Sequence, residues 1–148
     1  MTRSKRMQPV KQVADNREQA AVRRLGESQQ HLSAQEARLH ELCAYRDQYA
    51  RAFTEQGGNG IDAARLQDYR VFLARLNEAI RQQEALIVQC RSRHQQTRQQ
   101  WVQTRSHNQA IDKLIERFRR DELRRHARRE QQESDEHAQR RSGESESS

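Results

Sequence analysis

The fold is decided by a short stretch of sequence, Gln56-Gly57-Gly58-Asn59-Gly60-Ile61-Asp62. Its glycines can adopt the left-handed backbone conformation that ends a helix. Asp62 is a favourable N-cap for a following helix. Ile61 would then lie just outside that helix and pack on Leu66, as a hydrophobic staple. Because the connection is short, the two flanking helices are predicted to pack antiparallel.

Little else in the chain interrupts a helix. Pro9 is the only proline, Gly26 is the only glycine before the turn, and neither residue type occurs from residue 62 to residue 142. Only 32% of the residues are hydrophobic and 33% are charged, and the mean hydropathy is -1.30. This is too little apolar surface for a compact core, but it suits long helices that bury a narrow seam.

Apolar residues recur with the alternating spacing of a left-handed coiled coil in both halves of the chain. The stripe in the first half is Met7, Val10, Ala14, Arg17, Ala21, Leu25, Ser28, Leu32, Gln35, Leu39, Leu42, Tyr45, Tyr49 and Phe53. The stripe in the second half is Tyr69, Leu73, Leu76, Ile80, Gln83, Ile87, Cys90, His94, Thr97, Trp101, Thr104, Asn108, Ile111, Ile115 and Phe118. Folding the chain at the turn brings apolar residues of the two stripes opposite one another.

The facing layers give a register that can be checked. Tyr49 falls opposite Tyr69, Leu32 opposite Ile87, and Ser28 opposite Cys90. Gln35 falls opposite Gln83, a polar pair that either fixes the register or bends outward to water. Farther from the turn, Arg17 falls opposite Trp101, within reach of a cation–π contact.

We therefore expect an all-α fold, an elongated antiparallel two-helix coiled-coil hairpin that forms one domain over residues 1–142. Its first helix should span about residues 9–56 and its second about residues 62–135, with a turn at 57–61. Residues 143–148 are expected to be a disordered tail, because they consist of small and polar residues.

The second helix is predicted to extend beyond the first, past about residue 112. This overhang still carries apolar residues that another chain would have to cover: Leu114, Ile115, Phe118 and Leu123. Residues 119–129 are rich in arginine and contain only Asp121 and Glu122 as acids. With a formal net charge of +7, the chain suits an acidic protein surface, a nucleic acid or a membrane face.

A second apolar stripe runs beside the first on the second helix, because Phe72, Ala79 and Leu86 each precede a seam residue and repeat every seven positions. Such doubling fits either a docking face or a wider seam between splayed helices. The candidate docking surface combines this second stripe (Phe72, Leu76, Ala79, Gln83 and Leu86) with Arg38, Leu42, Tyr45 and Tyr49 of the first helix. We call its eight residues other than Leu86 the turn-proximal face.

Nothing in the sequence points to catalysis. The glycine turn lacks the Lys and Ser/Thr of a phosphate-binding loop, and no two histidines have the spacing that would place two metal ligands on one helix face. Cys43 and Cys90 are predicted to lie too far apart for a disulfide. There is neither a signal peptide nor an apolar run long enough for a membrane span. We expect a cytoplasmic protein that is not an enzyme and has no cofactor or metal.

One motif starts at the turn and continues into the second helix: Gly58-Asn59-Gly60-Ile61, then Arg65, Tyr69, Phe72, Leu76 and Ala79-Ile80. Three further segments accompany it, namely Leu25-Gly26-Glu27, Tyr45 with Tyr49, and Trp101 with Ala138-Gln139-Arg140. Together these residues resemble the FliJ family of bacterial flagellar export proteins over nearly the whole chain.

The resemblance implies a component of the flagellar type III export apparatus, involved in motility and chemotaxis and similar to the central stalk of rotary ATP synthases. Such a stalk would insert in the hexameric export ATPase FliI, which works with its regulator FliH, and promote assembly of the ring. The residues implied for this contact, here called the ring-binding set, are Arg17, Arg24, Trp101, Ile115, Phe118, Arg119 and Arg120.

The same resemblance assigns the turn-proximal face to the membrane export gate protein FlhA. It implies a protein at the cytoplasmic face of the inner membrane, attached only peripherally through that gate, with export chaperones as further partners. Three alternatives stay open from the sequence: the stalk of a virulence injectisome, a purely structural dimer, and a coiled coil whose arginines bind nucleic acid with steep salt dependence. Acidic residues interleaved along both helices argue against nucleic acid.

Overall fold

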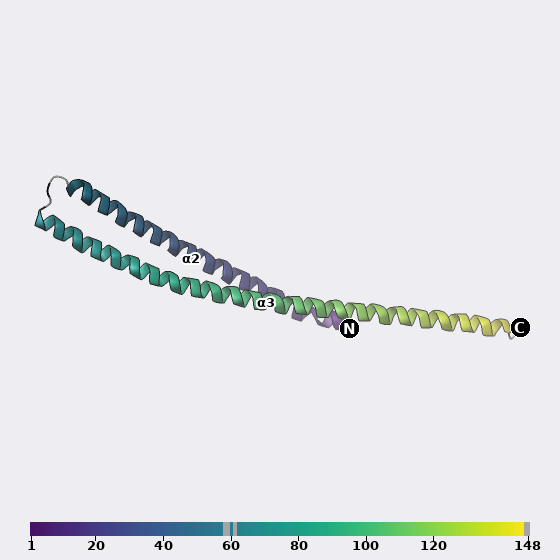
Figure 1. The fold of residues 1–148 in the computed structure, drawn as a ribbon. Helices are drawn as coiled ribbons and strands as arrows, with labels where there is room; N and C mark the ends of the chain where they lie inside the picture. The colour runs from purple at the N-terminus through teal and green to yellow at the C-terminus, as the bar shows by residue number, and fades with distance from the viewer. Residues whose placement is uncertain (58–59, 61, 147–148) are drawn as a thin grey trace. The chain divides into compact units, whose positions relative to one another are not determined.

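The computed structural model describes residues 1–57, 60 and 62–146. It contains a short helix α1 (Arg3–Arg6) and two long helices, α2 (Gln8–Gln56) and α3 (Ala63–Glu146), with no strand among the described residues (Figure 1). The two long helices pack against each other, so the predicted all-α coiled-coil hairpin is confirmed.

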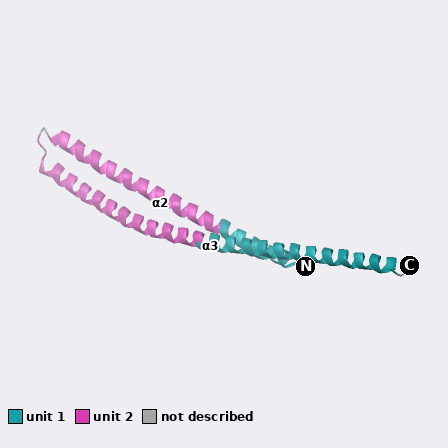
Figure 2. Ribbon diagram, turned by 45° about the vertical axis from the view of Figure 1, so that its right-hand side comes forward, with its two compact units in different colours: residues 1–19, 103–148 teal, residues 20–102 magenta. Residues whose placement is uncertain are grey.

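The chain divides into two compact units, each pairing part of α2 with part of α3 (Figure 2). The unit that contains the turn comprises Ala20–Val102 and is called the turn unit. The unit that contains both chain ends comprises Met1–Gln19 with Gln103–Ser148 and is called the terminal unit. The prediction of a single domain over residues 1–142 with a disordered tail at 143–148 stays a prediction, although α3 itself continues to Glu146.

The turn has the expected capping chemistry. Gly60 has a φ of 79°, a left-handed conformation that favours glycine. The Arg65 backbone N–H donates to Asp62 Oδ1 at 2.8 Å, so Asp62 caps α3 as predicted. The remaining turn residues, Gly58 and Asn59, and the staple residue Ile61 lie outside the described residues.

The first helical turn lies earlier than predicted. Thr2 caps α1 by accepting a hydrogen bond from the Lys5 backbone N–H at 3.4 Å, whereas we expected the helix to begin near Pro9. Pro9 has no N–H to donate to the preceding turn, which explains the short break at Met7 between α1 and α2. The helical path resumes at once, because the Met7 carbonyl accepts from the Lys11 N–H at 2.8 Å.

Because helical structure starts earlier than predicted, the overhang of α3 is shorter than predicted. Ile115 is only 5% exposed and forms a cluster with Ala14 and Ile111, against which Met7 packs. Every described residue after Glu122 is exposed, and Leu123 is 69% exposed. The unpaired part of α3 therefore begins after residue 122 and not after residue 112, because the N-terminal residues of the chain cover Ile115 themselves.

The seam of α2 was predicted wrongly at three positions. Lys11, Glu18 and Arg46 are half-buried, whereas their neighbours Val10, Arg17 and Tyr45, which we placed in the stripe, are exposed. The side chains that point inward keep a strict heptad spacing even where it selects a charged residue. Long polar side chains tolerate such positions because their stems pack while their charged ends find partners.

The α3 stripe and most of the register are confirmed. Tyr49 stacks on Tyr69 with ring centroids 5.4 Å apart, and Leu32 shares a buried cluster with Ile87. The Gln83 side-chain amide donates to the Gln35 carbonyl oxygen at 2.9 Å and to its side-chain oxygen at 2.8 Å. This polar pair therefore lies inside the seam and does not bend outward.

The Ser28 hydroxyl bonds farther along α3 than Cys90, the residue expected opposite it. It forms a hydrogen bond with His94 Nδ1 at 3.1 Å and with the Thr97 hydroxyl at 2.7 Å, while Ser28 and Cys90 line the same hollow. The hydroxyl needs a polar partner because it is buried, and Cys90 offers only a weak one.

Candidate protein interaction surfaces

An aromatic cluster marks the turn-proximal face. The Phe72 ring of α3 lies 4.4 Å from the Tyr49 ring and 6.1 Å from the Tyr45 ring of α2, measured between centroids. Nearer the turn, Phe53 stacks on Tyr69 at 3.8 Å. Interhelical aromatic pairs of this kind contribute about 0.5–1.5 kcal/mol each beyond the area they bury. The cluster therefore holds the helices together while leaving ring surface exposed.

The structure divides the predicted face into an inner and an outer part. Leu76 is 8% exposed and Gln83 is 7% exposed, so both belong to the seam. Tyr45 is 52% exposed, and Arg38 is exposed beside it. The other four residues, which are half-buried, are Leu42, Tyr49, Phe72 and Ala79.

The outer part of the face is hollowed on the α2 side. Arg38, Leu42 and Tyr45 line a shallow hollow of about 570 Å³ together with Glu41 and two alanines. A surface that combines partly exposed aromatic rings, a small-residue floor and an arginine has the composition of a protein docking site. Of the two interpretations of the doubled apolar stripe, the burial of Leu76 and Gln83 assigns these two residues to the seam, and the docking face stays a prediction.

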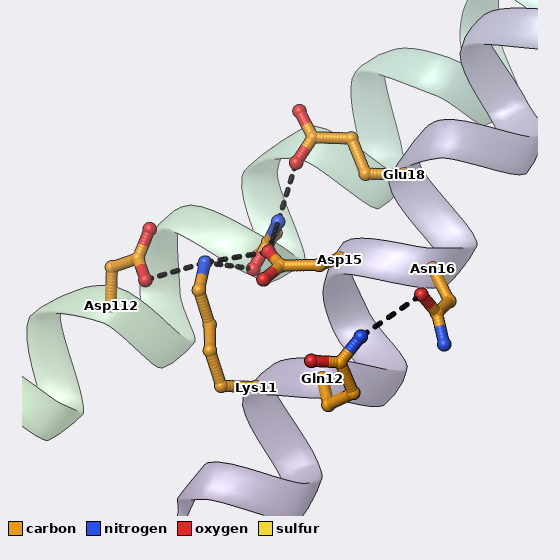
Figure 3. Close-up of polar contacts among 7 residues, drawn as sticks. Lys11, Gln12, Asp15, Asn16, Glu18 and Asp112 are labelled. Carbon is orange, nitrogen blue, oxygen red and sulfur yellow. Dashed lines mark hydrogen bonds and ion pairs between the residues drawn. The ribbon is translucent and has the colours of Figure 1, made fainter.

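A charged network joins the helices of the terminal unit (Figure 3). The Lys11 ammonium group lies 2.6 Å from an Asp112 carboxylate oxygen and 2.9 Å from an Asp15 carboxylate oxygen, and it donates to Asn108 Oδ1 at 2.8 Å. The Asn108 amide donates in turn to the Asp15 and Glu18 carboxylates. Asn108 is only 4% exposed, so this network closes a polar layer of the seam.

The network shifts the ionisation of its members. Hydrogen bonds with Asp112 and then Asp15 raise the pKa of Lys11. Hydrogen bonds from Lys11 and then Asn108 lower the pKa of Asp15. We did not predict this network from the sequence, although a strict heptad would have placed both Lys11 and Glu18 in the seam.

A second polar contact holds the N-terminus on α3. The Ser4 backbone N–H donates to one Glu122 carboxylate oxygen at 3.0 Å, and the Ser4 hydroxyl donates to the other at 2.8 Å. These two bonds, the backbone one first, lower the pKa of Glu122. The Arg3 guanidinium lies 5.7 Å from the centre of the Phe118 ring, within range of a cation–π contact.

Beside this contact lies a basic hollow of about 880 Å³. Its basic lining residues are Arg3, Lys5, Arg6, Arg125 and Arg129, with Phe118 between them and Asp121 and Glu122 as the acidic members. The hollow forms because α1 brings the basic start of the chain against the arginine-rich part of α3. Both basic segments are evident in the sequence, but no sequence pattern predicted that they would lie against each other.

The ring-binding set is only partly brought together. Phe118 lines the basic hollow, Ile115 is buried in the core cluster, and Arg120 pairs with Glu116 on its own helix. Arg17 and Arg119 are exposed in the same terminal unit. The remaining two residues, Arg24 and Trp101, belong to the turn unit.

Other chemistry is sparse in the part of the chain that the structure describes. No group of three His, Cys, Asp or Glu side chains there is arranged to hold a metal ion, and Cys43 and Cys90 are both free thiols. None of the described helices contains a segment apolar enough to cross a membrane.

Comparison with known proteins gives one consistent result. The family model described as "Flagellar FliJ protein" matches residues 3–147. A Flagellar FliJ protein of Salmonella typhi is 28% identical over 134 residues, which are 90% of this chain and 91% of that protein. No solved structure matches the chain.

Proposed function

The chain belongs to the FliJ family, and so to the flagellar protein export machinery, and we propose that it acts there as a stalk linking the export ATPase ring to the membrane export gate. In this proposal the terminal unit enters the ring of FliI and promotes its assembly. The turn-proximal face binds the gate protein FlhA at the cytoplasmic face of the inner membrane. The chain itself hydrolyses nothing.

The aromatic cluster is the observation that carries the gate contact. Tyr45, Tyr49 and Phe72 are held in place by one another, so little side-chain freedom is lost when a partner covers them. Interface hot spots are enriched in such rigid aromatic residues. Arg38 beside them offers a charged rim.

The terminal unit supports the ring contact by its charge. The basic hollow gathers five cationic side chains from α1 and α3, and exposed arginines continue along the unpaired part of α3. Such a surface accelerates association with an acidic partner and orients it. The matched family model and the matched protein are both flagellar, which favours this role over that of an injectisome stalk.

The gate contact is tested with the double variant Tyr45→Ala/Phe72→Ala. We expect binding of the cytoplasmic part of FlhA, measured by calorimetry, to weaken at least about tenfold, and swimming in soft agar to shrink. The matched control is Val88→Ala, because Val88 is 64% exposed in the same unit and lies outside the face. Unchanged FlhA binding with intact helicity by circular dichroism would contradict the assignment.

The ring contact is tested by truncation after Glu122. This end point preserves the Ser4–Glu122 contact and the covered Ile115, so the paired part of the unit should remain folded. We expect weaker stimulation of FliI ATPase activity, whereas truncation after Ser142 should leave stimulation unchanged. Full stimulation by the shorter protein would show that the unpaired helix does not act on the ring.

A further inference from the structure

The turn unit contains a second hollow, of about 510 Å³, between α2 and α3. Arg24, Ser28 and His31 of α2 line it together with Leu86, Cys90 and Arg93 of α3. We call it the arginine pocket. None of these residues belongs to the turn-proximal face, although Arg24 belongs to the ring-binding set. The pocket lies in the turn unit, whereas the basic hollow lies in the terminal unit.

The polar groups on the inner wall of the arginine pocket already have hydrogen-bond partners. Ser28 and Thr97 form a hydrogen bond with each other at 2.7 Å, Ser28 also bonds to His94, and Cys90 is only 6% exposed. These groups have little capacity left for a ligand, so the inner wall acts mainly as a surface for packing.

The rim of the pocket is different. Among the described residues, Arg24, His31 and Arg93 take part in no hydrogen bond or ion pair with another side chain. Glu27 is the acidic member of the lining, and the lining also contains the two arginines. Guanidinium groups bind carboxylates with paired, directional hydrogen bonds. The rim therefore has unused capacity for one carboxylate.

The pocket also continues the turn-proximal face along α3. Leu86 follows Phe72 and Ala79 at heptad spacing, which places the three side chains on one side of the helix. Leu86 is 38% exposed and lines the pocket. A segment lying on Phe72 and Ala79 would reach Leu86 next and then the two arginines.

We infer that the arginine pocket receives an aspartate or glutamate side chain of the same partner segment that covers the turn-proximal face. This inference rests on the proposed function, in which that segment belongs to the export gate. A protein segment fits the pocket better than a free anion, because it supplies both an apolar residue for Leu86 and a carboxylate for Arg24 and Arg93. The pocket then sets the direction in which the segment lies, since the carboxylate has to lie beyond Leu86, at Arg24 and Arg93.

Charge reversal tests the pocket. In Arg24→Glu/Arg93→Glu, binding of the cytoplasmic part of FlhA should weaken about tenfold, since each favourable contact becomes a like-charge contact, and its dependence on NaCl should flatten. Arg23→Glu/Arg98→Glu is the matched control, because it makes the same change in net charge at two exposed arginines that do not line the pocket. If Tyr45→Ala/Phe72→Ala loses binding while the pocket variant retains it, the pocket inference fails and the proposed function stands. If neither variant affects binding, or the wild type does not bind, both fail.

Cys90 provides a second measurement at the pocket itself. In a Cys43→Ser background it is the only thiol, and its alkylation rate by a maleimide reports access to the pocket. Saturating FlhA should slow this rate severalfold in the wild-type pocket and have no effect in Arg24→Glu/Arg93→Glu. An unchanged rate with bound FlhA would overturn the inference. Equal protection by inorganic phosphate alone would also overturn it, by assigning the pocket to a free anion.

Discussion

The turn unit and the terminal unit each pair part of α2 with part of α3, but different kinds of contact hold the two pairs together. The turn unit is held by stacked aromatic rings and by buried Leu32 and Ile87. The terminal unit has a small apolar cluster around Ala14 and is otherwise joined by charged and polar contacts. Apolar and aromatic contacts depend weakly on pH and salt, whereas ion pairs near the surface are screened and titrate.

Under the proposed function, this difference corresponds to a division of roles. A surface that docks on a gate benefits from a rigid platform, which stacked rings supply. A helix pair that enters a ring benefits from contacts that can be exchanged for contacts with the ring at little cost, which charged groups near water supply. The following predictions test this contrast, from the largest expected effect to the smallest.

Ile87→Ala should have the largest effect. Ile87 is 3% exposed, and truncating a buried Ile to Ala costs about 2–5 kcal/mol because a cavity remains. Amide hydrogen exchange should show the loss of protection in the turn unit, with the free energy of unfolding measured in urea. Val88→Ala, at an exposed neighbour, should change stability by less than about 0.5 kcal/mol. If protection were lost mainly in the terminal unit, the prediction that Ile87 stabilises the turn unit would be wrong.

Asn108→Ala should destabilise the terminal unit by about 1 kcal/mol, because it removes the hydrogen bonds that the buried Asn108 amide makes with half-buried side chains of α2. Lys11, Asp15 and Glu18 each contact Asn108. Hydrogen exchange should quicken in residues 8–19 and stay unchanged around Ile87. Gln103→Ala, on the exposed side of the same unit, is the control. An equal effect from the control would mean that the network carries no stability.

Acid should loosen the terminal unit before the turn unit. Asp15 and Glu122 have lowered pKa values in the folded chain, so the unfolded state binds more protons, and stability falls as the pH drops from about 5 to about 2. The raised pKa of Lys11 acts oppositely: its contribution is present below its ordinary value and is lost above about pH 10.5. NMR signals of both units followed through a pH titration measure the order. Simultaneous loss of both units would contradict it.

Salt should give the smallest effect. Raising NaCl from about 0.1 M to about 1 M shortens the screening length from about 10 Å to about 3 Å, which weakens the contact between Lys11 and Asp112. Hydrogen exchange in residues 8–19 should increase slightly, while exchange around Tyr49 and Tyr69 should not. In Lys11→Met the salt response should disappear. A salt response that survives this substitution would have to come from other charges.

Much of the fold was predictable because its determinants are local or periodic. The glycine turn, the Asp62 cap and the α3 heptad follow from backbone preferences and spacing, and they correctly placed Gln35 opposite Gln83. Two of the three errors on α2 lie where an apolar residue, Val10 or Tyr45, adjoins the strict heptad position. Choosing Val10 over Lys11 was reasonable by hydropathy, but Lys11 has Asp112 and Asn108 as partners on α3. A prediction from the sequence could not take these partners into account, because they lie near Lys11 only in the folded chain.

The sequence by itself determined that this chain forms two long helices, where they turn and which residues of α3 face the seam, since these depend on neighbours within a few positions. Only the tertiary structure decided which charged side chains of α2 enter the seam, that Ser4 meets Glu122, and that the basic N-terminus forms one hollow with α3. These features depend on atoms brought together from opposite ends of the chain. Their pairing is set by the geometry of the packed helices, which no local pattern contains.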